Sequence, residues 1–178
     1  MKVKRKHLTI FLVALFFILI FLLFDRMVLP VKNHKNTACA FCDKGVIEYQ
    51  KYFEDDKVMG LYCYKPIEKG HCLIVPKRHV EQYEDLNKEE ILAIDNLIKK
   101  TNIAARKVFG VASFLILQKN GKEVGQTIDH IHFHYIPRKE GKKSVLSFLS
   151  KFAFSKFKKT VSGDEMEEKK NALSAEIK

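Results

Sequence analysis

The sequence contains no internal repeat and no low-complexity block, which excludes a repeat architecture and a compositionally disordered chain. Its 178 residues are enough for one ordinary domain with extensions, and 47% of them are hydrophobic. That hydrophobic share is sufficient to bury a core. We therefore expect a folded globular domain.

The middle of the chain has little net charge, although the whole sequence carries +11. Residues 1–34 hold +5 and residues 141–178 hold +4, which leaves +2 for the stretch between them. Proteins that bind nucleic acid usually concentrate positive charge on the folded domain. Because the basic residues here lie in the two flanks, we do not expect nucleic acid as a partner.

Charged residues are missing from Leu8–Phe24, a run of 17 residues rich in Phe, Leu and Ile that follows a basic N-terminus. At about 1.5 Å per residue, this run and the nearby Val28 and Leu29 just span a bilayer core of about 30 Å. The pattern predicts a single-pass membrane anchor in residues 1–29 and a membrane localisation. A cleaved signal peptide has similar features, but no small-x-small cleavage site follows the run directly.

The flanks of this run leave open which side of the membrane would hold the domain, because the excess of basic residues before the run is small. Residues 30–36 then form a short polar linker. The sequence thus predicts four parts: the anchor, the linker, a folded domain over residues 37–140, and a basic, amphipathic and helical extension over residues 141–178.

Alternating apolar residues and turn residues predict a sheet in the middle of the chain. Strands are expected over residues 46–55, 57–64, 71–76, 111–118 and 127–136. Short turns separate the first three strands, and the second turn contains Pro66 and Gly70. This spacing is typical of an antiparallel meander.

Helical spacing follows the third strand, first in a short segment over residues 80–85 and then in a long helix over residues 88–109. Asn87 can cap the long helix with Glu90 as its capping-box partner, and Gly110 can end it. Apolar residues recur on one face of this helix, so we expect it to cover the sheet. The predicted fold class is α+β, an antiparallel sheet of about five strands with one long helix packed on it.

The extension after residue 140 has apolar residues such as Phe148 and Phe152 between lysines. This pattern fits an amphipathic helix on a membrane surface and equally a helix docked on the sheet. A second capped helix, solvated on its surface, is expected at the C-terminal end.

Histidine is scarce, with seven in the chain, yet three occupy alternate positions: His130, His132 and His134. On a strand these three would share one face. The opposite face would carry apolar core residues: Ile131, Phe133 and Tyr135. A single histidine on a strand is usually a surface residue, but imidazole is also an acid, base, nucleophile or metal ligand near neutral pH. Three histidines in register therefore favour a chemical role over a surface position without function.

The stretch GQTIDHIHFHYIPR, residues 125–138, resembles the signature of the histidine triad (HIT) family, His-x-His-x-His followed by two apolar residues. Asn120-Gly121 before it and GHCLIVPKRH, residues 70–79, are similar to other stretches of the family. The resemblance covers roughly residues 37–140. It implies a HIT-like fold, here carrying an N-terminal transmembrane helix and a helical C-terminal tail.

In chemical terms, the resemblance implies a nucleotidyl hydrolase or transferase that cleaves the α-phosphate bond of a nucleoside phosphoramidate or a dinucleoside polyphosphate. The middle histidine, His132, would be the nucleophile and would form a nucleotidyl-histidine that water then hydrolyses. The other residues implied in catalysis are His134, Gln126 and His71. The residues implied in substrate binding are Asn120, Gly125, Gln126, Thr127 and His134.

The CxxC motif CAFC at residues 39–42 could by itself form a disulfide or half of a metal site. HIT-like proteins with an N-terminal CxxC use two further histidines, so the resemblance implies a structural zinc site and no organic cofactor. The implied zinc ligands are Cys39, Cys42, His79 and His130.

One position departs from the family pattern. Cys63 stands three residues before Pro66, where the family usually has an Asp or Asn that contacts the ribose. By composition, Cys63 and Cys72 are both expected in the core. The departure motivates an alternative function, a membrane-tethered protein that binds a nucleotide or a partner with little turnover.

The His-x-His-x-His row also suits transition metals, so a metal-binding protein is another alternative function. The resemblance further implies a homodimer, because HIT domains usually pair.

Overall fold

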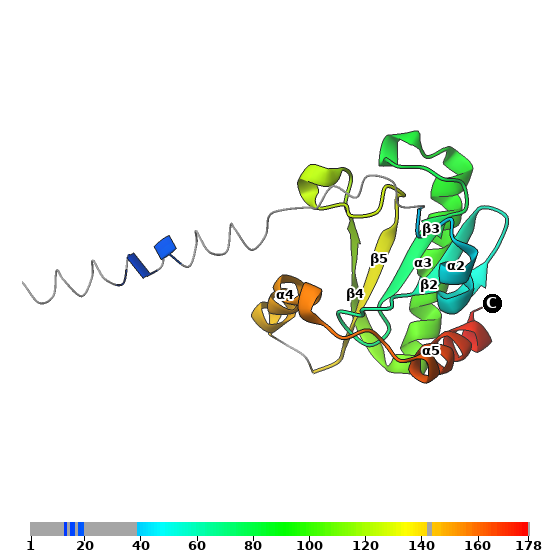
Figure 1. The fold of residues 1–178 in the computed structure, drawn as a ribbon. Coiled ribbons are helices and arrows are strands. Elements are labelled where there is room, and N and C mark those ends of the chain that lie inside the picture. Colours follow the sequence, from blue (N-terminus) through cyan, green and yellow to red (C-terminus); the bar gives the residue numbers. More distant parts are fainter. Residues whose placement is uncertain (1–12, 14, 17, 20–38, 142–143, 178) are drawn as a thin grey trace, which may run out of the picture. The chain divides into compact units, whose positions relative to one another are not determined.

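The structure is a computed structural model that describes residues 13, 15, 16, 18, 19, 39–141 and 144–177 (Figure 1). By its internal contacts the chain divides into two units, residues 1–36 and residues 37–178. The described residues of the first unit are helical. All strands of the described residues belong to the second unit.

The helices of the structure contradict the predicted single-pass membrane localisation. No helix within the described residues has the length and the apolar character that crossing a bilayer requires. Most of the run over residues 8–24, and the whole predicted linker over residues 30–36, lie outside the described residues.

Five strands form one antiparallel sheet in the order β1-β2-β3-β5-β4. The predicted α+β class, the five-stranded sheet and the initial meander are therefore confirmed. The strands are β1 (Lys51–Glu54), β2 (Val58–Tyr62), β3 (Cys72–Pro76), β4 (Val111–Gln118) and β5 (Phe133–Lys139). Every residue of β2 and β3 is buried, because the sheet carries a hydrophobic core on each face.

Helix α3 (Lys88–Phe109) covers one face of the sheet (Figure 1). The predicted capping box is confirmed, since the Asn87 side chain accepts a hydrogen bond from Glu90 N and the Glu90 carboxylate accepts one from Asn87 N. Gly110 ends the helix in the left-handed conformation at φ 65°, where a residue without a Cβ is favoured. Ile94 and Leu97 bury the apolar face of α3 against the sheet.

The strand predicted over residues 46–55 is wrong in its first half, where the chain forms helix α2 (Lys44–Gln50). The Asp43 side chain accepts a hydrogen bond from Val46 N at 2.9 Å and so caps this helix. An N-cap satisfies an otherwise unpaired amide, which favours a helix even where apolar residues are too few to distinguish helix from strand. Only β1 remains of the expected strand.

The histidine strand also begins later than predicted, because β5 starts at Phe133 and not near Thr127. Ile131 N donates to Val80 O at 2.7 Å, which draws the preceding segment away from the sheet ladder. His130 and His132 therefore precede the strand, and of the three histidines only His134 lies in β5. The apolar residues that alternate with the histidines lie in the main core, as predicted: Ile131, Phe133 and Tyr135.

The C-terminal extension packs on the domain through α4 (Val145–Ala153) and α5 (Gly163–Glu176). Phe148 of α4 is buried, which agrees with the docked-helix alternative. Helix α5 packs against α3 and β1, and Met166 and Leu173 are fully buried. The prediction that the last helix is solvated is therefore wrong for this face of α5.

Candidate active site and metal centre

A cavity of about 700 Å³ lies on the face of the sheet opposite α3. Alternate residues of a strand point to opposite faces, and Leu73 of β3 belongs to the core on the side away from α3. Leu73 lines the cavity together with the candidate catalytic residues His132 and His134. The wall is mainly apolar, with few polar groups, as in most small-molecule sites.

His132, the predicted nucleophile, is 7% exposed and held in one tautomer. Its Nδ1 lies 2.8 Å from the carbonyl oxygen of His130. A carbonyl only accepts, so Nδ1 carries the proton and Nε2 carries the lone pair. Burial lowers the pKa of His132, which favours the neutral imidazole that can act as a nucleophile.

A second chain of hydrogen bonds fixes His134. Ile67 N donates to His71 Nδ1 at 3.1 Å, so the proton of a neutral His71 is on Nε2. His71 Nε2 lies 3.0 Å from His134 Nδ1 and donates to it. The proton of His134 is consequently on its own Nε2, which makes that nitrogen a hydrogen-bond donor.

Both members of this pair are neutral. Burial, then the charge of Lys158, lowers the pKa of His71 to about 3. Burial, followed by the neighbouring His71, lowers the pKa of His134 to about 2. A neutral His71 and a neutral His134 are what the hydrogen-bond chain requires.

Gly125 and Thr127, two predicted substrate-binding residues, line the cavity. Gly125 adopts a left-handed conformation at φ 84°, which an ordinary side chain rarely takes. It follows the short helix η2 (Lys122–Val124), whose turn brings the backbone of Gly125 to the cavity wall.

Gln126 and Asn120 were expected to contact the substrate. Neither is among the described residues that line the cavity. Gln126 is buried; its Oε1 accepts from Gly121 N at 2.7 Å and its Nε2 donates to Glu81 O and Ile128 O. The amide of Gln126 thus ties together main-chain segments around the cavity.

Asn120 makes similar contacts outside the cavity wall. Its Oδ1 accepts from Tyr83 N at 2.7 Å and its Nδ2 donates to the Glu84 carboxylate at 2.8 Å. Tyr83 begins the short helix η1 (Tyr83–Asp85), so Asn120 joins η1 to the end of β4.

Lys119 is a cavity residue that the sequence analysis missed. Its Nζ donates to Gly125 O at 3.3 Å, and its charge contributes to the lowered pKa of His132 and His134. No carboxylate of the described residues forms an ion pair with it. Its position directly before the Asn120-Gly121 turn was the available signal.

Cys63 also lines the cavity, and it is buried. Burial raises the pKa of its thiol to about 11, so the group is uncharged at neutral pH. Cys63 and the fully buried Cys72 are both core residues, as predicted. None of the four cysteines, all of which the structure describes, is in a disulfide.

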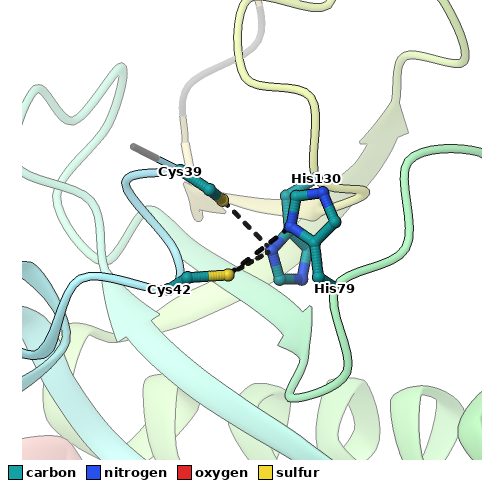
Figure 2. Close-up of side chains that lie close together, drawn as sticks. All are labelled: Cys39, Cys42, His79 and His130. Atoms are coloured by element: carbon teal, nitrogen blue, oxygen red, sulfur yellow. Dashed lines mark hydrogen bonds between the residues drawn. The ribbon is translucent and has the colours of Figure 1, made fainter. Parts of the chain in front are cut away.

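Four side chains form a cluster that could hold a metal ion, with ligand atoms all within 4.8 Å of one another: Cys39, Cys42, His79 and His130 (Figure 2). The cysteines precede α2, His79 follows β3, and His130 precedes β5. The cluster therefore joins three segments that are far apart in the sequence.

Three sulfur–nitrogen distances in the cluster fit a tetrahedral zinc site. With Zn–S near 2.3 Å and Zn–N near 2.0–2.1 Å, a sulfur and a nitrogen ligand lie about 3.5 Å apart. Cys39 Sγ lies 3.4 Å from His130 Nδ1, and Cys42 Sγ lies 3.5 Å from His79 Nδ1 and 3.7 Å from His130 Nδ1. His130 Nε2 donates to Pro76 O at 2.9 Å, which leaves Nδ1 available as a ligand.

A model of the HIT domain family matches residues 44–141, more than half of the chain. The protein belongs to the HIT family. The match ends shortly after β5, so α4 and α5 of this HIT protein lie beyond it.

Relatives of this HIT protein include proteins named as nucleotide hydrolases. An uncharacterized HIT-like protein of Methanocaldococcus jannaschii is 36% identical over 112 residues, which cover 62% of this chain and 86% of the relative. The adenosine 5'-monophosphoramidase hnt1 of Schizosaccharomyces pombe is 35% identical over 103 residues, 57% of this chain and 74% of the relative. The structure of the diadenosine triphosphate hydrolase of Plasmodium falciparum matches with a TM-score of 0.60 and 26% identity, covering 85% of this chain and 90% of that one.

Replacing Gln126 by Ala should lower the free energy of unfolding by about 1–3 kcal/mol, because buried main-chain groups lose a hydrogen-bond partner. Chemical denaturation of the wild type and of Gln126→Ala measures this difference in the free energy of unfolding. Gln82→Ala is the matched control, since Gln82 is exposed and caps η1 with no side-chain hydrogen bond. Equal free energies of unfolding for Gln126→Ala and Gln82→Ala would show that the Gln126 amide does not stabilise the main chain around it.

Proposed function

We propose that this HIT protein is a nucleotidyl hydrolase or transferase that cleaves the α-phosphate bond of a nucleoside phosphoramidate or a dinucleoside polyphosphate. The observation that carries the proposal is His132, a buried and neutral imidazole in the cavity with its lone pair on Nε2. The names of the relatives in Schizosaccharomyces pombe and Plasmodium falciparum supply the two substrate classes.

The proposed reaction has two displacements at phosphorus. His132 Nε2 forms a bond to the α-phosphorus while the bond to the leaving nitrogen or oxygen breaks, and an amine leaving group takes up a proton from solvent. Water then attacks phosphorus and gives up a proton to solvent, the P–Nε2 bond breaks, and a nucleoside monophosphate is released. The covalent route replaces one difficult displacement by two easier ones.

Other residues are proposed to hold the phosphate. His134 donates through Nε2–H to a phosphate oxygen, because its Nδ1 already accepts from His71. Thr127 offers a hydroxyl donor at the cavity wall, and Gly125, whose own N–H donates to Lys122 O, lines the same wall. Donors that are oriented before the reaction stabilise the charge that develops in the transition state. For Gln126 and Asn120, the hydrogen bonds support a role in holding these donors in place.

Zinc is proposed as a structural ion held by the four-residue cluster. A bound zinc ion would fix the CxxC segment to His79 and His130. His130 would then hold the metal through Nδ1 while its carbonyl oxygen accepts from His132 Nδ1–H. The ion would thus orient the nucleophile without taking part in the reaction.

The binding-protein alternative keeps one supporting observation. Cys63 places an uncharged thiol in the cavity, where a carboxylate or amide would bind ribose hydroxyls more strongly. Tight nucleotide binding with no covalent intermediate and no turnover would favour this alternative.

The His132→Ala protein should lose turnover by a factor of about 10³ or more, because it lacks the nucleophile. Release of nucleoside monophosphate from an adenosine phosphoramidate and from a dinucleoside triphosphate measures this loss. His34→Ala, a histidine substitution outside residues 37–178, is the control and should retain activity. Unimpaired release by His132→Ala would rule out the nucleotidyl-histidine route.

The purified protein should contain about one zinc ion per chain, and Cys42→Ser should reduce this content and lower the melting temperature. Elemental analysis and thermal denaturation provide the two readouts. Cys63→Ala is the cysteine control, because Cys63 lies outside the cluster and should leave the zinc content unchanged. A full zinc content in Cys42→Ser would contradict the ligand assignment.

A homodimer is also proposed, with β4 as the contact. This strand lies at the edge of the sheet, and Phe114 and Leu115 are 41% and 39% exposed. Leu115→Glu should shift the protein toward monomer in sedimentation equilibrium, since it places a charge at the proposed contact. Leu146→Glu changes an exposed leucine of α4 and should leave the association unchanged. A wild-type protein that is monomeric at all concentrations would refute the dimer.

A further inference from the structure

A segment beyond the family match contacts the wall of the active site. We define the strap as residues 144–161, which contain α4, and the β2–β3 loop as residues 63–71, which precede β3. Val161 N donates to Tyr64 O at 2.9 Å, and Tyr64 lines the cavity. The strap thus reaches a part of the chain that forms the candidate site.

Lys158 of the strap binds the backbone of the β2–β3 loop. Its Nζ donates to Pro66 O at 2.9 Å and to Ile67 O at 2.5 Å. Hydrogen bonds from an ammonium group are stronger than those between neutral groups, and two of them hold adjacent carbonyls in one orientation. Lys158 therefore fixes the peptide groups on both sides of Ile67.

Two further contacts hold the same loop. Phe148 of α4 forms a small buried cluster with Ile67 and with Ile136 of β5. Lys151 forms an ion pair with Glu68. The strap therefore fastens the middle of the β2–β3 loop to the strand that carries His134.

The backbone amide of Ile67 connects this loop to the chemistry. Ile67 N–H donates to His71 Nδ1, which places the His71 proton on Nε2 and, through the bond to His134 Nδ1, the His134 proton on Nε2. If Ile67 N–H moved away, His71 could carry its proton on Nδ1 instead. His71 Nε2 would then accept from His134 Nδ1–H, and His134 Nε2 would have no proton to donate to a phosphate.

We propose that Lys158 is a positioning residue, which selects the donor tautomer of His134 by fixing Ile67 N–H against His71. The inference rests on the proposed function for the role of His134 on the phosphate. The contact chain itself consists of Lys158, Ile67, His71 and His134, and it runs from the C-terminal extension to the cavity.

The first test compares Lys158→Met and Lys159→Met in the full chain with an adenosine phosphoramidate and a dinucleoside triphosphate as substrates. Lys158→Met should lower kcat by about tenfold to a hundredfold with little change in KM, because a misplaced donor acts mainly on the transition state. Lys159 is the exposed neighbour of Lys158, and Lys159→Met should behave as the wild type. Lys158→Arg should restore most of kcat, since a guanidinium can donate to both carbonyls. Equal kcat values for both Met variants would overturn the proposal.

The second test reads the tautomer without any turnover. Long-range ¹H–¹⁵N spectra of the histidine rings should show His71 protonated on Nε2 in the wild type and in Lys159→Met. In Lys158→Met the Nδ1-protonated form of His71 should become populated. An unchanged His71 tautomer would overturn the proposal, even if Lys158→Met is less stable.

The two tests separate this inference from the proposed function. A wild-type protein without turnover would count against the proposed function, while a tautomer change in Lys158→Met would still support the positioning role. If Lys158→Met does not fold, Lys158→Gln is measured in the same spectra, because its neutral amide ends one bond closer to the backbone and weakens both contacts to the loop carbonyls. Wild-type tautomers in a folded Lys158→Gln protein, with wild-type kcat, would overturn the inference.

Discussion

The hydrogen bond from His132 Nδ1–H to the carbonyl oxygen of His130 connects the two parts of the candidate site. On one side, the ring of His130 lies in the four-residue cluster with its Nδ1 directed to the cysteines. On the other side, the same bond sets the lone pair of His132 on Nε2. Any displacement of His130 would therefore move the proposed nucleophile, so an ion bound at the cluster would help to fix the position of His132.

A matching constraint holds the other histidine of the cavity. The hydrogen bond from His71 sets the tautomer of His134. A hydrogen bond from a backbone amide of the β2–β3 loop sets the tautomer of His71. Burial lowers the pKa of both His71 and His134, so hydrogen bonds and not charges orient them. The site thus pairs one imidazole that presents a lone pair with one that presents a proton, an arrangement suited to displacement at a phosphate.

Two kinds of feature could be predicted from the sequence. Some have local causes, and others follow from the residues that resemble the HIT family. The Asn87–Glu90 capping box and the left-handed Gly110 depend on neighbouring residues, and the four-residue cluster depended on the family pattern. Features that depend on distant contacts were not predicted. The late start of β5 follows from a hydrogen bond to Val80, and the engagement of Gln126 follows from Glu81, 45 positions earlier. Helix α2 was missed because a single cap at Asp43 decided between two readings of a short apolar segment.

The proposed covalent intermediate can be detected by mass spectrometry of the protein during turnover. The protein is mixed with a dinucleoside triphosphate or a phosphoramidate, quenched within milliseconds to seconds, digested and analysed by mass spectrometry at a pH that preserves phosphoramidate bonds. We expect a nucleoside monophosphate adduct on the peptide that contains His132, located on that residue by fragmentation and absent without substrate. Turnover without any adduct on His132, or with an adduct on another residue, would show that His132 Nε2 is not the nucleophile.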